Sequence, residues 1–198
     1  MIKDILQDIN EDKYQNYRTT SNKFKTDIWN FFNKDFRDET VVEFGTHKGG
    51  STRVLSFLFK DVHTVNYDSM EAAKQLNSDR TNIEYLDIDL YSTPTIEIKH
   101  KDPVSVFLVD AGHLYSNVID DMNRIFTMNC KKDCYIIFDD YGMNRWKDDV
   151  RRAIDEAIEA NAIEVVKEIG HPLGHDFGGG RVLEGPEGLI TKIKWNED

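Results

Sequence analysis

The stretch TVVEFGTHKGGS, residues 40–51, predicts a strand that runs directly into a glycine-rich turn and then into a helix. The strand, Thr40–Phe44, is rich in β-branched residues and carries Glu43 near its end. Gly45 and Gly49 let the backbone turn tightly and approach a ligand closely, and the next helix begins with free N–H groups. The spacing is E-x-G-x-x-x-G, not the G-x-G-x-x-G of dinucleotide enzymes. By itself the loop therefore indicates either a nucleotide-like ligand or a plain strand-to-helix turn.

Beyond this stretch, short β-rich runs alternate with helical segments. Further strands are expected at Val62–Tyr67, Asn82–Leu86, Val104–Val109, Cys134–Phe138, Ile163–Ile169 and Gly188–Ile193. Helices are expected at Ser51–Phe59, Ser69–Asn77, Tyr115–Met128 and Trp146–Ala160. This alternation predicts an α/β fold in which helices cover both faces of a parallel sheet. Ligands of such sheets bind beyond the carboxyl ends of the strands, so the residues just after each strand are the candidates for function.

Composition limits the classes of partner. The chain has 198 residues, which suits one domain, and its net charge of -11 would repel nucleic acid. No apolar run approaches the roughly 20 residues of a membrane span, and the N-terminus alternates charged and apolar residues, unlike a signal peptide. Cys130 and Cys134 lack the further paired ligands of a zinc site and are expected to be free thiols. We therefore expect a cytoplasmic protein, in a cell or in an infected host, with no membrane and no nucleic-acid partner.

The N-terminal part differs from the rest. Residues 1–38 are expected to form a helical extension of the same domain as residues 39–198, because their apolar residues follow the helical period. Four aromatic residues of this extension could also pack against a partner subunit in a homo-oligomer: Trp29, Phe31, Phe32 and Phe36.

Acidic residues follow the second and third predicted strands. Asp68 lies one strand–helix–strand step after Gly45 and can accept hydrogen bonds from both ribose hydroxyls of a nucleoside. It can also cap the next helix. Asp87 follows the third strand and can bond the exocyclic amine of adenine, although acids in loops are commonly just solvated.

The fourth and fifth strands end in Asp110 and in Asp139–Asp140, with His113 three residues after Asp110. If these strands are neighbours, three carboxylates converge, and a divalent cation would relieve their repulsion. Oxygen ligands favour Mg²⁺, Mn²⁺ or Ca²⁺ over zinc. Alternatively, the acids cap helices or pair with nearby arginines. His113 is a candidate general base, because histidine titrates near neutral pH, or a structural residue.

Two segments carry a family resemblance: LVDAGHLYSNV, residues 108–118, and IIFDDY, residues 136–141. They resemble class I S-adenosylmethionine-dependent methyltransferases. Their D-x-x-H and D-D patterns are similar to those of the macrocin-type sugar O-methyltransferases, which are metal-dependent. The resemblance covers roughly Thr40 to Ile193. Tyr67 departs from it, because many relatives place a small residue before the acid that follows the second strand.

The resemblance implies a Rossmann-like seven-stranded sheet, mostly parallel, with the last strand antiparallel. Residues 39–198 would bind S-adenosylmethionine through Glu43, Gly45, Thr46, Gly49, Ser51, Asp68, Asp87 and Asp110. By similarity, Mg²⁺ would be held by Asp110, Asp139 and Asp140, and His113 would be the catalytic base. Separately from the resemblance, the N-terminal helices and the glycine-rich segment 171–181 are expected to face the substrate. The four glycines of this segment fit a mobile gate or an ordinary flexible connection between the last two strands.

The leading hypothesis is a metal-dependent O-methyltransferase that acts on a small hydroxylated molecule, such as a sugar. A metal-independent small-molecule methyltransferase is the second. A non-catalytic module that only binds S-adenosylmethionine is the third. A dehydrogenase is disfavoured, because the loop spacing is wrong for a nicotinamide cofactor.

Overall fold

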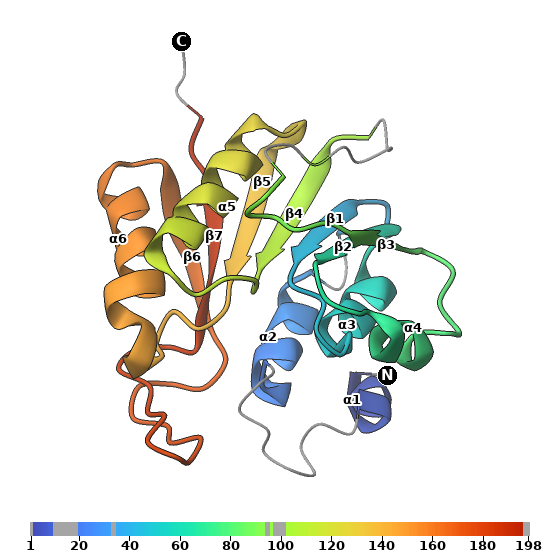
Figure 1. Ribbon diagram of the computed structural model, residues 1–198, viewed down its shortest axis with the longest axis horizontal. Helices are drawn as coiled ribbons and strands as arrows, with labels where there is room; N and C mark the ends of the chain where they lie inside the picture. Colours follow the sequence, from blue (N-terminus) through green and yellow to red (C-terminus); the bar gives the residue numbers. More distant parts are fainter. Residues whose placement is uncertain (1, 10–19, 33–34, 94–95, 97–101, 196–198) are drawn as a thin grey trace.

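The computed structural model describes residues 2–9, 20–32, 35–93, 96 and 102–195. In Figure 1 a central sheet lies between helices. The strands are β1 Thr40–Phe44, β2 Asp61–Asn66, β3 Ile83–Asp87, β4 Val104–Val109, β5 Cys130–Phe138, β6 Ile163–Ile169 and β7 Gly188–Ile193. The α-helices are α1 Ile2–Ile9, α2 Asn22–Phe32, α3 Gly50–Leu58, α4 Glu71–Leu76, α5 Tyr115–Thr127 and α6 Arg152–Glu159. Within these described ranges, no helix is both long and apolar enough to cross a membrane.

The seven strands form one sheet in the order β3-β2-β1-β4-β5-β7-β6. Neighbouring strands from β3 to β5 are parallel, and only β7 runs antiparallel to its neighbours β5 and β6. The predicted Rossmann-like class I methyltransferase fold is confirmed, including its antiparallel last strand. The chain builds outward from β1 to β3 and then crosses to β4 on the other side of β1. The carboxyl ends of β1 and β4 therefore border the crevice where such sheets bind ligands.

Both faces of the sheet are buried, which explains why its central strands are almost continuously apolar. Successive residues of a strand point to opposite faces. Val42 and Phe107 pack in a cluster with residues of α5 and α6. Val41 and Leu108 pack in a second cluster with α1, α2 and α3. The helices that begin at the site are thus fixed against a rigid sheet.

The aromatic residues of the N-terminal part lie in the second of these clusters. Trp29 and Phe32 are 8% and 0% exposed. The rings of Phe31 and Phe36 lie 4.7 and 4.8 Å from that of Phe32. These four side chains therefore contribute to the core of their own chain, and a homo-oligomer through the N-terminal helices stays a prediction.

Two elements differ from their predicted bounds by more than two residues. β5 begins at Cys130 rather than at Cys134, because Val104 pairs with Cys130 while Val106 already pairs with Tyr135. The residues in between form a polar bulge, and polar residues carry no strand signal in a hydrophobicity pattern.

The helix predicted from Trp146 is divided into three pieces. A 3-10 turn η2, Asn144–Trp146, and a π-helical turn η3, Lys147–Arg151, precede α6. Apolar periodicity does not distinguish these turns from an α-helix, because their helical periods are similar. π-helical turns are frequent at functional sites, and this one directly follows Trp146.

Candidate functional site

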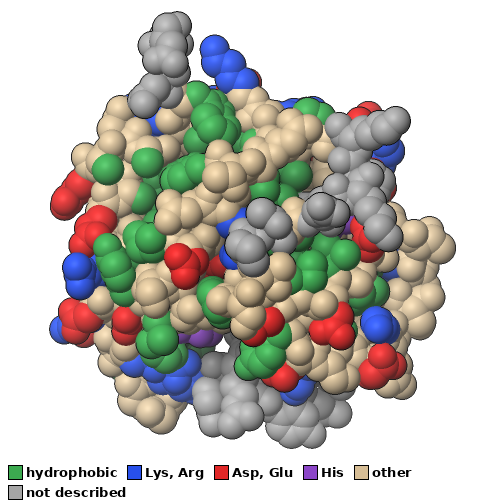
Figure 2. Space-filling view, turned by 45° about the horizontal axis from the view of Figure 1, so that its top comes forward, with side chains coloured by type: hydrophobic (Ala, Val, Ile, Leu, Met, Phe, Trp, Pro, Cys, Tyr) green, Lys and Arg blue, Asp and Glu red, His purple; other side chains and the backbone are tan. Residues whose placement is uncertain are grey.

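A cavity of about 570 Å³ lies at the carboxyl ends of the central strands. It is lined by residues 65–69, 88–91 and 110–113, together with Gly45 and His47. These segments follow β2, β3, β4 and β1, so four neighbouring strands supply its walls. In Figure 2, histidine and basic side chains gather beside a hollow at the lower edge of the molecule. The size of the cavity suits a nucleoside-sized ligand.

Gly45 lies where β1 leaves the sheet, with a φ of 98°. The N–H of Gly45 donates to the Val65 carbonyl oxygen, and the N–H of Asp110 donates to the Phe44 carbonyl oxygen, both at 2.9 Å. A Cβ on Gly45 would lie 1.9 Å from the backbone oxygen of Asp110. The close approach that requires a glycine here is thus to the backbone that follows β4, and the predicted approach to a ligand stays a prediction.

Gly49 caps the start of α3 with a φ of 79°. A Cβ there would lie 2.7 Å from Cβ of Ala73 on α4. The side-chain amide of Asn77 donates to the Gly49 carbonyl oxygen at 3.2 Å. Gly49 thus packs α3 against α4 and lies outside the residues that line the cavity.

Glu43 is fully buried beneath the turn and does not line the cavity. Its Oε2 accepts hydrogen bonds from the hydroxyls of Thr52 and Thr64, at 2.5 and 2.6 Å. Burial raises the pKa of Glu43 to about 7, and the two hydroxyls oppose that shift. The carboxyl group therefore ties β1 to α3 and β2, and it supports the glycine turn from below.

The other loop residues of the prediction also make contacts within the chain. The Thr46 hydroxyl lies 2.6 Å from that of Thr64, and the Ser51 hydroxyl lies 2.8 Å from that of Thr20. Neither Thr46 nor Ser51 lines the cavity. Thr20 lies two residues before α2, so the second contact joins the segment that leads into α2 to the start of α3.

Of the two acids that follow β2 and β3, Asp68 lines the cavity and Asp87 lies just before its lining segment. Asp68 is exposed. It does not cap the next helix, because the N-cap residue of α4 is Met70 and makes no side-chain capping bond. The expectation that Asp68 faces a ligand is therefore consistent with its position.

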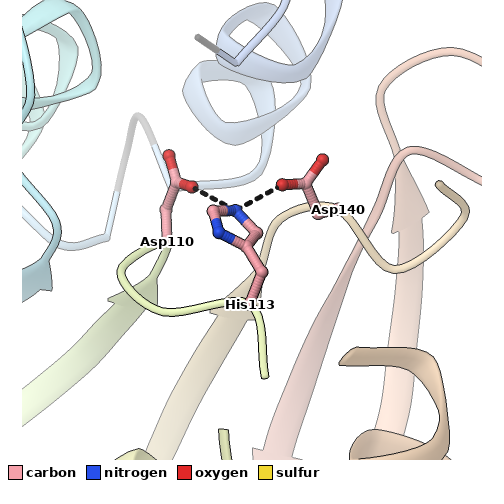
Figure 3. A group of neighbouring side chains, drawn as sticks. All are labelled: Asp110, His113 and Asp140. Atoms are coloured by element: carbon pink, nitrogen blue, oxygen red, sulfur yellow. Dashed lines mark ion pairs between the residues drawn. The ribbon is translucent and has the colours of Figure 1, made fainter. Parts of the chain in front are cut away.

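Asp110, His113 and Asp140 form one group at the ends of β4 and β5, which Figure 3 shows with both carboxylates directed toward the imidazole. His113 Nε2 lies 2.7 Å from Asp140 Oδ2 and 4.0 Å from Asp110 Oδ1. One atom from each of the three side chains fits within a mutual distance of 4.8 Å. Asp140 adopts a φ of 57°, an uncommon value for a residue other than glycine.

Crowding of charge shifts the pKa values of this group. Burial raises the pKa of Asp110 to about 8, the charge of Asp140 adds to the shift, and His113 opposes it. Burial alone would lower the pKa of His113, but the hydrogen bond to Asp140 and the charges of both acids outweigh it and raise that pKa.

Asp139, the third acid of the predicted metal site, lies next to this group but is 8% exposed. Burial and the charges of Asp110 and Asp140 raise the pKa of Asp139 well above its ordinary value. Its Oδ1 is buried and has no hydrogen-bond partner among the described residues. Such an atom is costly unless something outside the protein contacts it.

The arginines after β5 do not neutralise these acids. Arg151 donates to the Tyr141 carbonyl oxygen at 3.2 Å, and Arg152 pairs with Glu156 at 2.8 Å. The guanidinium of Arg145 lies 4.7 Å from the centre of the Trp146 ring. The described contacts therefore do not support the alternative in which arginines simply pair with the acids.

Three further residues at or beside the site were not predicted from the sequence. The indole of Trp146 stacks on the imidazole of His113, with 4.9 Å between centroids and 18° between planes. His47 lines the cavity from a φ of 44°, and Tyr91 lines it from the loop after β3. For His47, its place between the two glycines of the turn was a usable signal. Trp146 and Tyr91 reach the site only through tertiary packing.

The glycine-rich segment 171–181 lies beside the turn after β5. The side-chain amide of Asn144 donates to the Gly180 carbonyl oxygen at 3.2 Å, and Met143 pairs with Leu183, two residues beyond the segment. These contacts hold the segment against the turn that leads to Trp146, and its role in facing a substrate stays a prediction.

Residues 42–141 match a family model described as a methyltransferase domain, which is just over half of the 198-residue chain. The chain belongs to this methyltransferase family. The matched range includes Gly45, Asp68, the D-x-x-H turn and both acids after β5. Membership of the class I methyltransferases is therefore confirmed at the level of family and fold.

One curated relative of this methyltransferase domain is uncharacterized protein R132 of Acanthamoeba polyphaga mimivirus. It is 28% identical over 141 residues, which are 65% of this chain and 62% of that protein. The chain thus matches less than two thirds of the length of this relative.

Three solved structures share the fold. Cofactor-bound Rv0187 from MTB has a TM-score of 0.67 and 15% identity, and the match covers 97% of this chain and 88% of that one. An rRNA methylase of Streptococcus thermophilus has a TM-score of 0.60 and 16% identity, with coverages of 83% and 92%. SMU.1697c, a putative methyltransferase of Streptococcus mutans in complex with SAH, has a TM-score of 0.59 and 11% identity, with coverages of 85% and 98%. At these identities the likeness concerns the fold alone.

Proposed function

We propose that this protein transfers the methyl group of S-adenosylmethionine to a hydroxyl of a small molecule, such as a sugar, with the help of a divalent cation. One observation carries the proposal. A single cavity connects Asp68, the candidate ribose partner, with Asp110 and His113, the candidate reaction centre. All three lie within the range that matches the methyltransferase family.

The donor part rests on the glycine turn and on this cavity. Gly45 and Asp68 lie on its wall one strand–helix–strand step apart, as expected for a nucleoside-bearing ligand. Glu43, Thr46, Gly49 and Ser51 support the turn from outside the cavity, so we assign them to holding its shape. The structure of SMU.1697c in complex with SAH, which shares the fold, agrees with this choice of donor.

The metal part rests on the chemistry of the ligand atoms. Asp110 and Asp140 belong to a group whose atoms fit within a mutual distance of 4.8 Å, and Asp139 has a buried oxygen without a partner among the described residues. We assign the cation to these three acids and leave His113 for proton transfer. The carboxylates favour a hard cation, which we infer to be Mg²⁺, Mn²⁺ or Ca²⁺. When bound, such a cation would lower the pKa of an acceptor hydroxyl.

The residues of the chain would then perform alignment and proton transfer. The bond between the acceptor oxygen and the methyl carbon forms as the carbon–sulfur bond breaks, and the hydroxyl proton passes to Nε2 of His113. Trp146 fixes the orientation of the imidazole ring through its stacking contact. The product S-adenosylhomocysteine keeps the former bonding pair on its neutral sulfur.

A small acceptor fits this chain better than RNA, although one structure with the same fold is an rRNA methylase. The net charge of -11 opposes the approach of a phosphate backbone.

Cys130 and Cys134 are free thiols, which supports a cytoplasmic location.

A second candidate is a metal-independent methyltransferase. It is favoured by the hydrogen bond of 2.7 Å between His113 Nε2 and Asp140, because a carboxylate that holds the proton on Nε2 leaves Nδ1 of the same imidazole as a general base without a cation.

Isothermal titration of the full chain with S-adenosylhomocysteine, and separately with Mn²⁺, tests both parts. We expect both to bind, and we expect Asp140→Asn to weaken Mn²⁺ binding at least about tenfold while S-adenosylhomocysteine still binds. The control is Asp120→Asn, which changes an exposed acid on α5. If Mn²⁺ gives no heat with the unaltered protein, the metal-independent function is the better one. If S-adenosylhomocysteine does not bind, the methyltransferase proposal itself is wrong.

A screen of hydroxylated small molecules with methyl-labelled S-adenosylmethionine tests catalysis. Transfer of the label to a hydroxyl supports the proposal. Donor binding without transfer to any acceptor in a broad screen favours a non-catalytic binding module.

A further inference from the structure

Tyr91 lies in the loop after β3, and its ring forms part of the cavity wall. The side chain crosses from this loop to the turn after β4, which carries Asp110 and His113. Sequence patterns gave this residue no role, and the reaction outlined above does not use it.

The Tyr91 hydroxyl makes two hydrogen bonds whose directions are fixed by chemistry. The backbone N–H of Gly112 donates to it at 2.6 Å. Since an N–H can only donate, the hydroxyl proton is directed to Oδ2 of Asp121, 3.3 Å away. Tyr91 thus joins the D-x-x-H turn to helix α5.

The contact explains the glycine of the D-A-G-H turn. A Cβ on Gly112 would lie 2.4 Å from the Tyr91 oxygen and 2.8 Å from Cβ of Asn117. Gly112 does not have a positive φ. Close packing by Tyr91 and Asn117, and not a special backbone conformation, therefore favours a glycine between Asp110 and His113.

The loop that carries Tyr91 is itself held on α5. Arg124 donates to the carbonyl oxygens of Leu90 and Thr93, on either side of Tyr91. It also lies 3.5 Å from Asp121, which is fully buried. The loop that carries Tyr91 and the carboxylate that accepts its proton are therefore both held by α5.

We propose that Tyr91 is a positioning residue that locks the Asp110–His113 turn to the wall of the donor cavity. Its ring contacts the donor side, while its hydroxyl sets the backbone immediately before His113. The same side chain thereby fixes the position of the proton acceptor, His113, relative to the bound donor. This inference rests on the proposed function for the roles of the cavity and of His113, and on the described contacts for the geometry.

The test compares Tyr91→Phe with Tyr85→Phe in the full chain. Tyr85 is a matched control, because its half-buried hydroxyl also makes a hydrogen bond, to the Ala73 carbonyl oxygen at 3.2 Å, but it lies outside the cavity. We expect Tyr91→Phe to speed hydrogen exchange of the Gly112 amide about tenfold and to weaken Mn²⁺ binding about tenfold. S-adenosylhomocysteine affinity should change less than about threefold, because the ring remains in the cavity wall. Tyr85→Phe should change none of these.

An unchanged Gly112 amide, or a loss of Mn²⁺ affinity that Tyr85→Phe reproduces, overturns the proposal. Gly112→Ala gives a second approach, because the new methyl group would meet both the Tyr91 oxygen and Cβ of Asn117, and it should weaken Mn²⁺ binding at least as much as Tyr91→Phe. If the unaltered protein binds no Mn²⁺, the metal part of the proposed function fails. The exchange rate of the Gly112 amide, together with the ¹⁵N shift of the His113 imidazole, then still decides the role of Tyr91.

Discussion

The imidazole of His113 is hydrogen-bonded through Nε2 to the carboxylate of Asp140 at a distance of 2.7 Å. The same nitrogen is the atom expected to take a proton from the acceptor, and the same carboxylate is a candidate metal ligand. A cation would therefore compete with His113 for Asp140, and its binding would release the imidazole for catalysis.

His113→Ala tests whether this histidine is a base or a ligand. If His113 is the base, its removal frees Asp140, and Mn²⁺ should bind at least as tightly as to the unaltered protein. Titration calorimetry measures this, with His175→Ala as a control at a half-exposed histidine outside the candidate metal group. A loss of Mn²⁺ affinity of about tenfold or more would instead identify His113 as a ligand.

Asp68→Ala should weaken S-adenosylhomocysteine binding at least about tenfold, because the ribose hydroxyls would lose two hydrogen bonds that are partly charge-assisted. Asp87→Ala is the comparison. Asp87 lies just outside the segments that line the cavity, so its effect should be smaller. Equal losses for the two variants would give Asp87 the adenine contact that the sequence suggested. No loss for Asp68→Ala would remove the ribose assignment.

Much of the fold could be predicted because the signals were local. β1, β4, β6 and β7 have the predicted bounds, since each is a run of strand-forming residues between turn signals. The positions of Asp110 and Asp140 at neighbouring strand ends followed from the same alternation. The pairing of β4 with β5 confirms the assumption on which the acid cluster depended.

The remaining features arise from packing between distant segments, which no single pattern encodes. Glu43 was expected to face the donor, but the hydroxyls of Thr52 and Thr64 hold it beneath the turn. Trp146 reaches His113 only because the 3-10 and π-helical turns after β5 replace the start of a regular helix. Tertiary contacts of this kind override local propensity.

Gly45→Ala should destabilise the protein strongly and abolish S-adenosylhomocysteine binding. The substitution combines a left-handed backbone with a Cβ only 1.9 Å from the Asp110 carbonyl oxygen. Gly178→Ala separates the two effects, because Gly178 also has a positive φ, 83°, but has nothing within 4 Å of its Cβ position. We expect Gly178→Ala to lower the free energy of unfolding by about 1 kcal/mol, and Gly45→Ala by more than about 3 kcal/mol. Urea denaturation measures both, and equal losses would show that β1 and β4 can separate at little cost.

Glu43→Gln should make the stability of the protein less dependent on pH. In the folded protein, burial raises the pKa of Glu43 from its ordinary value of 4.5 to about 7. Below the lower value the carboxyl group is protonated in both states and has no effect. As the pH rises from 4.5 to 7 the folded state retains a proton that the unfolded state loses, so stability falls, and above pH 7 the loss is constant. The shift corresponds to a loss on the order of 3 kcal/mol.

The variant should therefore match the unaltered protein near pH 4.5 and exceed it in free energy of unfolding at pH 8, because a glutamine oxygen can still accept from both threonines. Denaturation at several pH values measures this, with Glu71→Gln as the control, since the side chain of Glu71 on α4 is 81% exposed. A difference between Glu43→Gln and the unaltered protein that stays the same from pH 4.5 to 8 would show that Glu43 is ionised in the fold throughout that range.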